Sequence, residues 1–213
     1  AVLYLAVVGL ACGLAFVRVT PALTAPDEYT HLAAAYEQAS RWSGQAAADE
    51  NGRLLFTKEM KQEYTILMPQ MLPIHFGMFK KMLQLEGYHV EQLNNQGRAV
   101  VDEGLKYVHN DTCYPALLVI GQLIDAVKSG KYDMHKVALL ITQTGGGCRA
   151  SNYIHLLRKA LEKAGLSYIP VISVNLSGLE PNPGFKLGLN TLRKAVFAMM
   201  YGDIIVQTAN QVR

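Results

Sequence analysis

The residues best suited to chemistry lie in a glycine-rich stretch that reads Thr142-Gln-Thr-Gly-Gly-Gly-Cys-Arg-Ala-Ser-Asn-Tyr153. Gly145, Gly146 and Gly147 follow an apolar run and precede a helical pattern, so their backbone N–H groups are able to approach a ligand closely. Cys148 then stands at the start of the predicted helix, where the helix dipole favours the thiolate. That thiolate would serve as an iron ligand, as a nucleophile, or as a bystander in a phosphate-binding turn. The alternative is a plain tight turn followed by a small buried cysteine.

Three known loop motifs do not fit this stretch. A nucleotide-hydrolase phosphate loop needs Lys and then Ser or Thr after its glycines, but Cys148 and Arg149 follow here. The dinucleotide fingerprint G-x-G-x-x-G is absent. A cysteine-phosphatase loop would place an arginine six residues after the cysteine, where this chain has Ile154.

A second cysteine, Cys113, occupies a similar place in the sequence. It lies in Asn110-Asp-Thr-Cys-Tyr-Pro115, where Asn110 or Asp111 is suited to cap the apolar helix that follows. Two thiols at helix starts near one sheet edge suit a soft metal or an iron–sulfur cluster. Their separation of 35 residues excludes a C-x-x-C zinc or ferredoxin signature.

The cysteine count agrees with this interpretation. The chain has 3 cysteines in 213 residues, an odd number that does not indicate a disulfide framework. Cys12 lies inside an apolar run and is not expected to join the other two.

Strands and helices alternate along the part of the chain that carries these loops. Apolar, partly β-branched runs predict strands at 64–68, 88–93, 137–142 and 168–174. Helical periodicity predicts helices at 74–85, 99–108, 114–127, 149–164 and 187–207, with Gly87 and Gly165 ending two of them. This alternation predicts an α/β fold with a parallel sheet and helices on both faces, in Rossmann- or flavodoxin-like layers.

The loops that follow strands in such a sheet are the expected ligand-binding region, because ligands bind beyond the carboxyl ends of parallel strands. That rule selects residues 69–75, 94–98, 143–148 and 175–183, and the loop 109–113 is expected to fold over the same edge.

Composition divides the chain into two parts. Residues 1–50 hold 2 basic and 5 acidic side chains, whereas residues 51–213 hold 18 basic and 12 acidic ones. We therefore expect an N-terminal segment over 1–50 and an α/β module over 52–213. The overall charge of +3 is too small and too scattered to predict nucleic-acid binding.

The N-terminal segment begins with an uncharged apolar run over 1–17, which predicts a helix long enough to span a membrane at the short limit. Asp27, Glu28 and His31 follow two prolines. This arrangement weakly resembles the first extracytoplasmic segment of predicted bacterial polytopic membrane proteins, similar to glycosyltransferases that use lipid-linked sugars. In such proteins the acidic pair would hold a metal or act as a base; its simpler role is helix capping.

Several longer strings in the second part resemble the 2-hydroxyacyl-CoA dehydratase family, specifically the large proteins that fuse a dehydratase-like module to a CoA-enzyme activase. The resemblance runs over about 52–213. It is carried by Phe56-Thr-Lys-Glu-Met, Met68-Pro-Gln-Met, Pro73-Ile-His-Phe, Lys106-Tyr-Val-His-Asn-Asp-Thr-Cys-Tyr-Pro-Ala, Gly121-Gln-Leu-Ile-Asp-Ala, the glycine-rich stretch and Asn175-Leu-Ser-Gly-Leu-Glu.

The resemblance implies a 4Fe–4S cluster with Cys113 and Cys148 as ligands. An ATP-dependent activase, fused or separate, would inject one electron, and a CoA thioester substrate would be reduced to a ketyl radical that expels its hydroxyl. Ser151 and Asn152 would donate hydrogen bonds toward the cluster or substrate, or else cap the helix. His75 and His109 would carry protons.

The family pattern is not complete, because a cluster usually has three or four protein ligands and this region has two cysteines. We expect the module to be incomplete at its C-terminus. The module is expected in the cytoplasm, with membrane attachment through residues 1–17. The alternatives are a membrane-anchored α/β protein that binds a ligand or partner without catalysis, and nucleophilic catalysis by Cys148.

Overall fold

The computed structural model describes residues 48–49, 53–109, 112–142, 152–174 and 182–212. All of them lie in one compact unit, Ala46–Arg213. The apolar run over 1–17 and the acidic pair Asp27 and Glu28 lie outside the described residues. No helix within the described ranges combines the length and apolar content needed to cross a membrane.

Four parallel strands form the sheet of this unit, in the order β2-β1-β3-β4. The strands are β1 (Thr65–Met68), β2 (His89–Gln92), β3 (Val137–Thr142) and β4 (Val171–Val174). Strand β1 lies between β2 and β3 in the sheet. The strand order therefore changes direction at β1: β2 is added on one side of it, and β3 and β4 are added on the other. The predicted parallel α/β sheet is confirmed.

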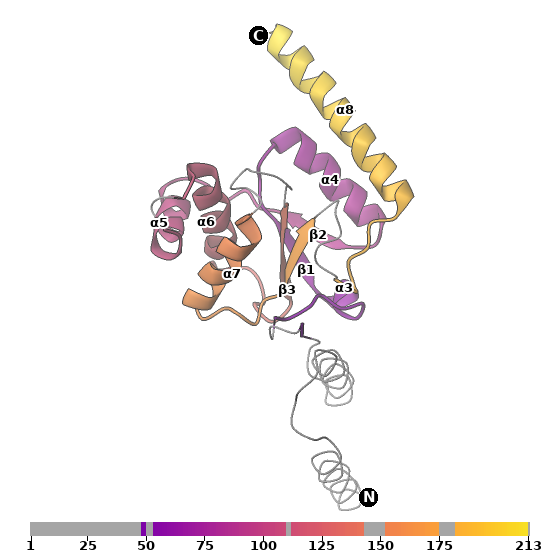
Figure 1. Cartoon of the computed structure of the whole chain (residues 1–213). Helices are drawn as coiled ribbons and strands as arrows, with labels where there is room; N and C mark the ends of the chain where they lie inside the picture. Colours follow the sequence, from indigo (N-terminus) through magenta and orange to yellow (C-terminus); the bar gives the residue numbers. More distant parts are fainter. Residues whose placement is uncertain (1–47, 50–52, 110–111, 143–151, 175–181, 213) are drawn as a thin grey trace, which may run out of the picture. The chain divides into compact units, whose positions relative to one another are not determined.

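Helices connect and cover the strands, and they lie on both faces of the sheet (Figure 1). They are α3 (Met60–Glu63), α4 (Pro73–Leu85), α5 (Arg98–Tyr107), α6 (Tyr114–Lys128), α7 (Tyr153–Lys163) and α8 (Leu189–Val212). In Figure 1, α5, α6 and α7 lie on one side of the strands and α4 and α8 on the other.

Side-chain alternation along each strand supplies the two cores. In β1, Leu67 belongs to the apolar cluster beneath α6 and α7, whereas its neighbours Ile66 and Met68 belong to the cluster beneath α4. In β3, Leu139 and Leu140 face opposite clusters in the same way. A strand buried on both faces must be apolar at every position, and this explains the continuous apolar run over 137–141.

Two of the predicted helix ends depend on glycine. Gly87 has φ +83° and Gly165 has φ +72°, in the left-handed region that a side chain disfavours. The amide of Gly87 donates to the carbonyl of Gln84 and that of Gly165 to the carbonyl of Glu162, so both glycines close the last helical turn.

The sequence predicted most element boundaries to within two residues, with four exceptions. Helix α7 begins at Tyr153 rather than at position 149. The short helix α3 was not expected. Strand β4 begins at Val171 rather than at position 168, because residues 166–169 form a turn in which the amide of Ile169 donates to the carbonyl of Leu166. Helix α8 continues to Val212, beyond the predicted 207.

Helix α8 is held against α4 near both ends of α4. The Lys194 ammonium lies 2.9 Å from Glu86, just after the last residue of α4, and lowers the pKa of that carboxyl by donating a hydrogen bond to it. His75, in the first turn of α4, lies against Gly202 and Asp203. The two helices therefore run antiparallel, and the last turns of α8 project past the start of α4, where apolar side chains such as Ile204 and Ile205 are exposed.

Candidate functional site

The sequence predicted that the ligand-binding loops lie beyond the carboxyl ends of the strands. Of these loops, residues 69–75 and 94–98 are fully described, and they meet beside each other after β1 and β2. The loop 143–148, with Gly145, Gly146, Gly147 and Cys148, lies outside the described residues, as does Ser151. Nothing in the structure tests their predicted roles.

The loop 175–183 was expected at the carboxyl ends of the strands, but its last residues lie elsewhere. Asn182 accepts a hydrogen bond from the Phe56 amide at 3.5 Å, and Gly184 donates to the Phe56 carbonyl at 2.8 Å. The hydroxyl of Tyr88, which immediately precedes β2, donates to the carbonyls of Gly184 and Lys186. These contacts place the end of the 175–183 loop near the amino ends of the strands rather than the carboxyl ends.

Cys113 lies at the carboxyl edge, directly before α6. Because the helix begins at Tyr114, Cys113 itself occupies the N-cap position, so the expected cap at Asn110 or Asp111 is corrected. Its side chain makes no capping hydrogen bond, is half-buried, and packs against the core beneath α6. The sulfur therefore lies at the positive end of a fifteen-residue helix dipole, which favours a thiolate.

A tyrosine from a distant part of the chain contacts this sulfur. Tyr153 is the first residue of α7, and its Oη lies 3.5 Å from Cys113 Sγ. The Tyr153 side chain is buried, whereas Asn152, before it, is exposed and occupies the N-cap of α7 without a side-chain capping bond. Asn152 therefore occupies the N-cap position that its predicted capping role requires, but its side chain does not make the capping hydrogen bond. The contact brings the starts of α6 and α7 together.

The two histidines expected to carry protons lie in different surroundings. His75 is buried, with its ring packed on the Gly202 backbone and Nε2 3.0 Å from Asp203 Oδ1. His109 is exposed in the loop before α6, and its carbonyl accepts a hydrogen bond from the amide of Thr112. His109 thus lies in the Cys113 loop, while His75 is held by α8.

An amide-lined cavity of about 520 Å³ opens beside these loops. Four hydrogen bonds form a network in and behind its wall. Gln122 Oε1 accepts from the Gln70 amide at 2.8 Å, and Gln122 Nε2 donates to the Asn95 carbonyl at 2.8 Å. Asn95 Nδ2 donates to the Gln122 carbonyl at 2.9 Å and to Asp125 Oδ2 at 2.7 Å. Loops after β1 and β2 are thereby fixed to α6.

Sequence reasoning missed this cavity, although a signal for it existed. Gln122 is a buried polar residue in the middle of the apolar α6. A buried amide must find partners, so its presence in an otherwise apolar helix indicated a polar contact to another element. What the sequence did not show was that the partners lie 52 and 27 residues away.

The close approach of α5 and α6 shapes the same wall. A Cβ on Gly121 would lie 2.2 Å from the Val100 carbonyl oxygen, and one on Gly104 would lie 2.6 Å from that of Leu117. Only glycine fits at either position. The two helices therefore cross in contact, and Val100, Val101, Leu118 and Val119 from this pair line the cavity.

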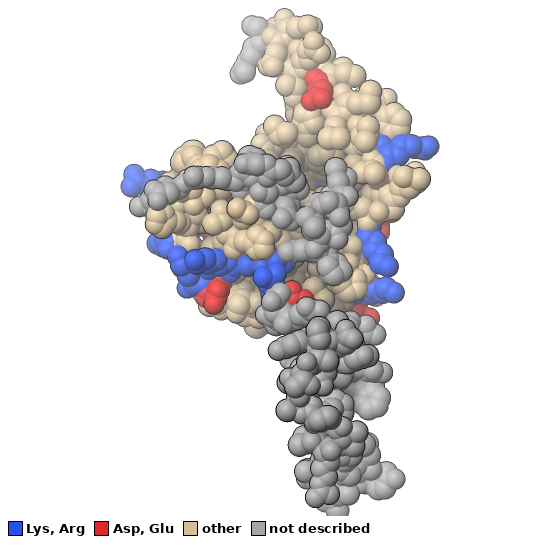
Figure 2. Space-filling model, viewed as in Figure 1, with Lys and Arg blue, Asp and Glu red and all other residues tan. Residues whose placement is uncertain are grey.

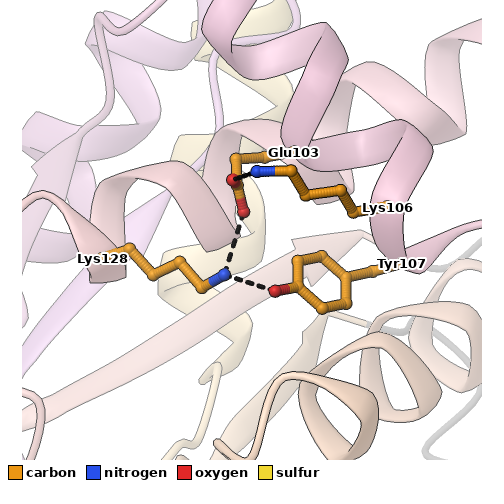
Figure 3. Close-up of polar contacts among 4 residues, drawn as sticks. All are labelled: Glu103, Lys106, Tyr107 and Lys128. Atoms are coloured by element: carbon orange, nitrogen blue, oxygen red, sulfur yellow. Dashed lines mark hydrogen bonds and ion pairs between the residues drawn. The ribbon is translucent and has the colours of Figure 1, made fainter.

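Charged side chains link the same two helices at the surface (Figure 3). Glu103 of α5 lies between Lys106 and Lys128, and Lys128 of α6 also reaches the Tyr107 hydroxyl. Hydrogen bonds from Lys106 and Lys128 lower the pKa of Glu103, despite partial burial. Burial lowers the pKa of Lys128, but its bonds to Tyr107 and Glu103 raise it overall.

A second hollow, of about 470 Å³, lies at the amino end of β4. Arg53, Arg158, Lys159 and His155 line it together with Glu162. Figure 2 shows basic side chains gathered in a row over α7. This hollow is far more basic than the amide-lined cavity, where the lining residues that the structure describes include no Lys, Arg, Asp or Glu.

Comparisons with models of protein families, with curated proteins and with solved structures found no match.

Proposed function

We propose that residues 52–213 form an iron–sulfur redox module resembling the 2-hydroxyacyl-CoA dehydratases. In this proposal Cys113 and Cys148 hold a 4Fe–4S cluster, an ATP-dependent activase supplies one electron, and the module acts on CoA thioesters. The observation that carries it is the contact of Cys113 Sγ with Tyr153 Oη at 3.5 Å. Tyr153 follows Cys148 by five residues, so this contact ties the Cys113 loop to the helix that the glycine-rich stretch enters.

Of the two proposed cluster ligands, Cys113 is among the described residues, and its surroundings fit the proposal. Cys113 is a half-buried sulfur at a helix N-terminus, in a loop at the carboxyl edge, as a cluster thiolate would be. Within the described ranges no group of three or more His, Cys, Asp or Glu side chains is arranged to hold a metal ion. The proposal therefore depends on Cys148, together with any further ligand from outside the described part.

The chain's own groups would act on the sulfur and on the substrate. A bound cluster supplies one-electron transfer or Lewis acidity. The Tyr153 hydroxyl donates toward a Cys113 thiolate, and hydrogen bonds to cluster sulfurs raise the reduction potential. Asn152 and Ser151 lie directly before Tyr153 in the sequence and would donate toward the cluster or the substrate.

The proposal also covers the detailed fold of the module and its location in the cell. The strand order β2-β1-β3-β4 is that of the first four strands of flavodoxin-like sheets, which supports such a layered fold for the module. We propose that the module works in the cytoplasm, where thiols stay reduced. The N-terminal apolar helix over 1–17 would attach it to a membrane.

Anaerobic reconstitution of the full chain with iron and sulfide tests the cluster. The expected product is brown, with broad visible absorption and about four irons and four sulfides per chain, as a 4Fe–4S cluster requires. Cys113→Ser and Cys148→Ser should each reduce the iron content, and the double variant should abolish it. Cys12→Ser is the matched control and should keep the wild-type iron content.

Two further outcomes decide the assignment. A Tyr153→Phe variant should keep its iron while its reduction potential becomes more negative, because one hydrogen bond to sulfur is lost. Iron-free wild-type protein after reconstitution, or a double cysteine variant that binds as much iron as the wild type, would overturn the proposal.

A further inference from the structure

The amide-lined cavity has the composition of a site for an uncharged ligand. Its lining divides into apolar groups from the two crossing helices and amides from the loops after β1 and β2. Tyr114, 60% exposed, also lines the cavity and offers an aromatic ring. Because none of the described lining residues is Lys, Arg, Asp or Glu, that part of the wall provides no counter-charge for a carboxylate, phosphate or ammonium group.

The polar part of the wall is fixed before any ligand enters. Gln122 is bonded through both ends of its amide, to the Gln70 amide and to the Asn95 carbonyl. Gln122 is only 7% exposed, so these bonds are sheltered from water. Preformed polar groups in a largely apolar hollow at the carboxyl ends of parallel strands are typical of ligand sites.

One atom of this wall lacks a partner. Asn95 Oδ1 is buried and is the one buried side-chain polar atom of the described residues without a hydrogen bond. The amide has little freedom to turn over, because Asp125 Oδ2 and the Gln122 carbonyl both require the Nδ2 donor on their side. A buried acceptor without a donor is costly, so a donor brought by a ligand would be strongly favoured there.

We propose that this cavity binds an uncharged carboxamide, free or as part of a larger molecule, whose N–H donates to Asn95 Oδ1. The apolar body of the ligand lies between α5 and α6, and a flat group stacks on Tyr114. Asn95 Oδ1 itself is closed to solvent, so the proposal includes an opening of the turn at Gln96 and Gly97, which are exposed. The site is independent of the cluster proposed above, because it uses neither Cys113 nor Cys148.

Three small probes test the chemistry on the unchanged full chain. Benzamide carries the N–H donor, N,N-dimethylbenzamide lacks it, and benzoate replaces the amide by a charge. In ¹H–¹⁵N NMR titrations, benzamide should shift the Asn95 side-chain NH₂ signals and the Gln70 backbone amide signal. Its affinity should exceed that of N,N-dimethylbenzamide at least tenfold, as satisfaction of a buried acceptor implies. Benzoate should bind more weakly than benzamide.

A pair of tryptophan variants in α5 locates the binding. Val101 lines the cavity, whereas Leu105 is 47% exposed on the same helix and does not. Val101→Trp should abolish the benzamide shifts, and Leu105→Trp should preserve them, with both proteins checked for wild-type spectral dispersion. Equal affinity for benzamide and N,N-dimethylbenzamide, unchanged binding in folded Val101→Trp, or no benzamide shift up to its solubility limit would each overturn the proposal.

Discussion

His75 Nε2 lies 3.0 Å from Asp203 Oδ1, across 128 residues of sequence. The imidazole is buried while the carboxylate is 80% exposed, so the pair lies at the edge of the contact between α4 and α8. Gly202 lies beneath the ring, where any Cβ would be 2.4 Å from His75 Cδ2. The fit of α8 to α4 therefore depends on a missing side chain as well as on a hydrogen bond.

Gly202→Ala should destabilise the fold by about 1–3 kcal/mol, because the added methyl forces α8 away from the buried His75 ring. Thermal and urea unfolding measure this change. Gly77→Ala in α4 is the matched control. The nearest atom to its new Cβ is 3.9 Å away, so the better helix propensity of alanine should stabilise by about 0.5–1 kcal/mol. Equal effects of the two substitutions would contradict the packing argument.

The paired amides at the cavity give a second prediction. Gln122→Met keeps the size of the side chain but leaves the Gln70 amide and the Asn95 carbonyl without partners. Two partly buried backbone groups without hydrogen bonds should cost about 1–3 kcal/mol in unfolding free energy. Gln96→Met, at an exposed lining position, should stay within about 0.5 kcal/mol of the wild type. A small loss in Gln122→Met would show that water replaces these bonds.

The sequence predicted what depends on local pattern. Apolar runs located all four strands, and Gly87 and Gly165 marked helix ends, because these signals arise from burial and from backbone conformation at the position itself. The sheet's parallel arrangement followed from the alternation of strands and helices. The predicted start of β4 was wrong because the turn before Val171 contains apolar residues that are buried without pairing in the sheet.

The contacts that define the candidate sites were not predictable in this way. The sequence placed Cys113 at a helix start, but nothing in it indicated that Tyr153 would contact the sulfur. The Gln122 network joins three elements through single hydrogen bonds, and no periodicity encodes such partners. Side-chain pairing across loops depends on how the helices cross, and that crossing is set here by Gly104 and Gly121.

The ion pair between α5 and α6 should couple the two helices measurably. A double-mutant cycle of Glu103→Gln and Lys128→Met should give a coupling of about 0.5–1 kcal/mol at neutral pH, since both groups are partly sheltered. The pKa of Glu103 is lowered in the folded chain, so its contribution is present above about pH 4.5 and is lost as the pH falls through the lowered value. Coupling that persists below that value would contradict the assignment. The exposed pair Arg98 and Asp102 is the control, with coupling close to zero.

Tyr132 provides a prediction at the alkaline end. Its hydroxyl donates to Glu91 Oε1 at 2.6 Å, and burial together with this carboxylate raises the pKa of Tyr132 to about 12. Because the folded-state pKa lies above the ordinary value of about 10, the contribution of this tyrosine to stability is complete below about pH 10 and is lost as the pH rises toward about 12. The tyrosinate absorbance of wild type minus Tyr132→Phe should isolate this step, and Glu91→Gln should move it toward lower pH. A step that stays in place in Glu91→Gln would assign the raised pKa to burial alone.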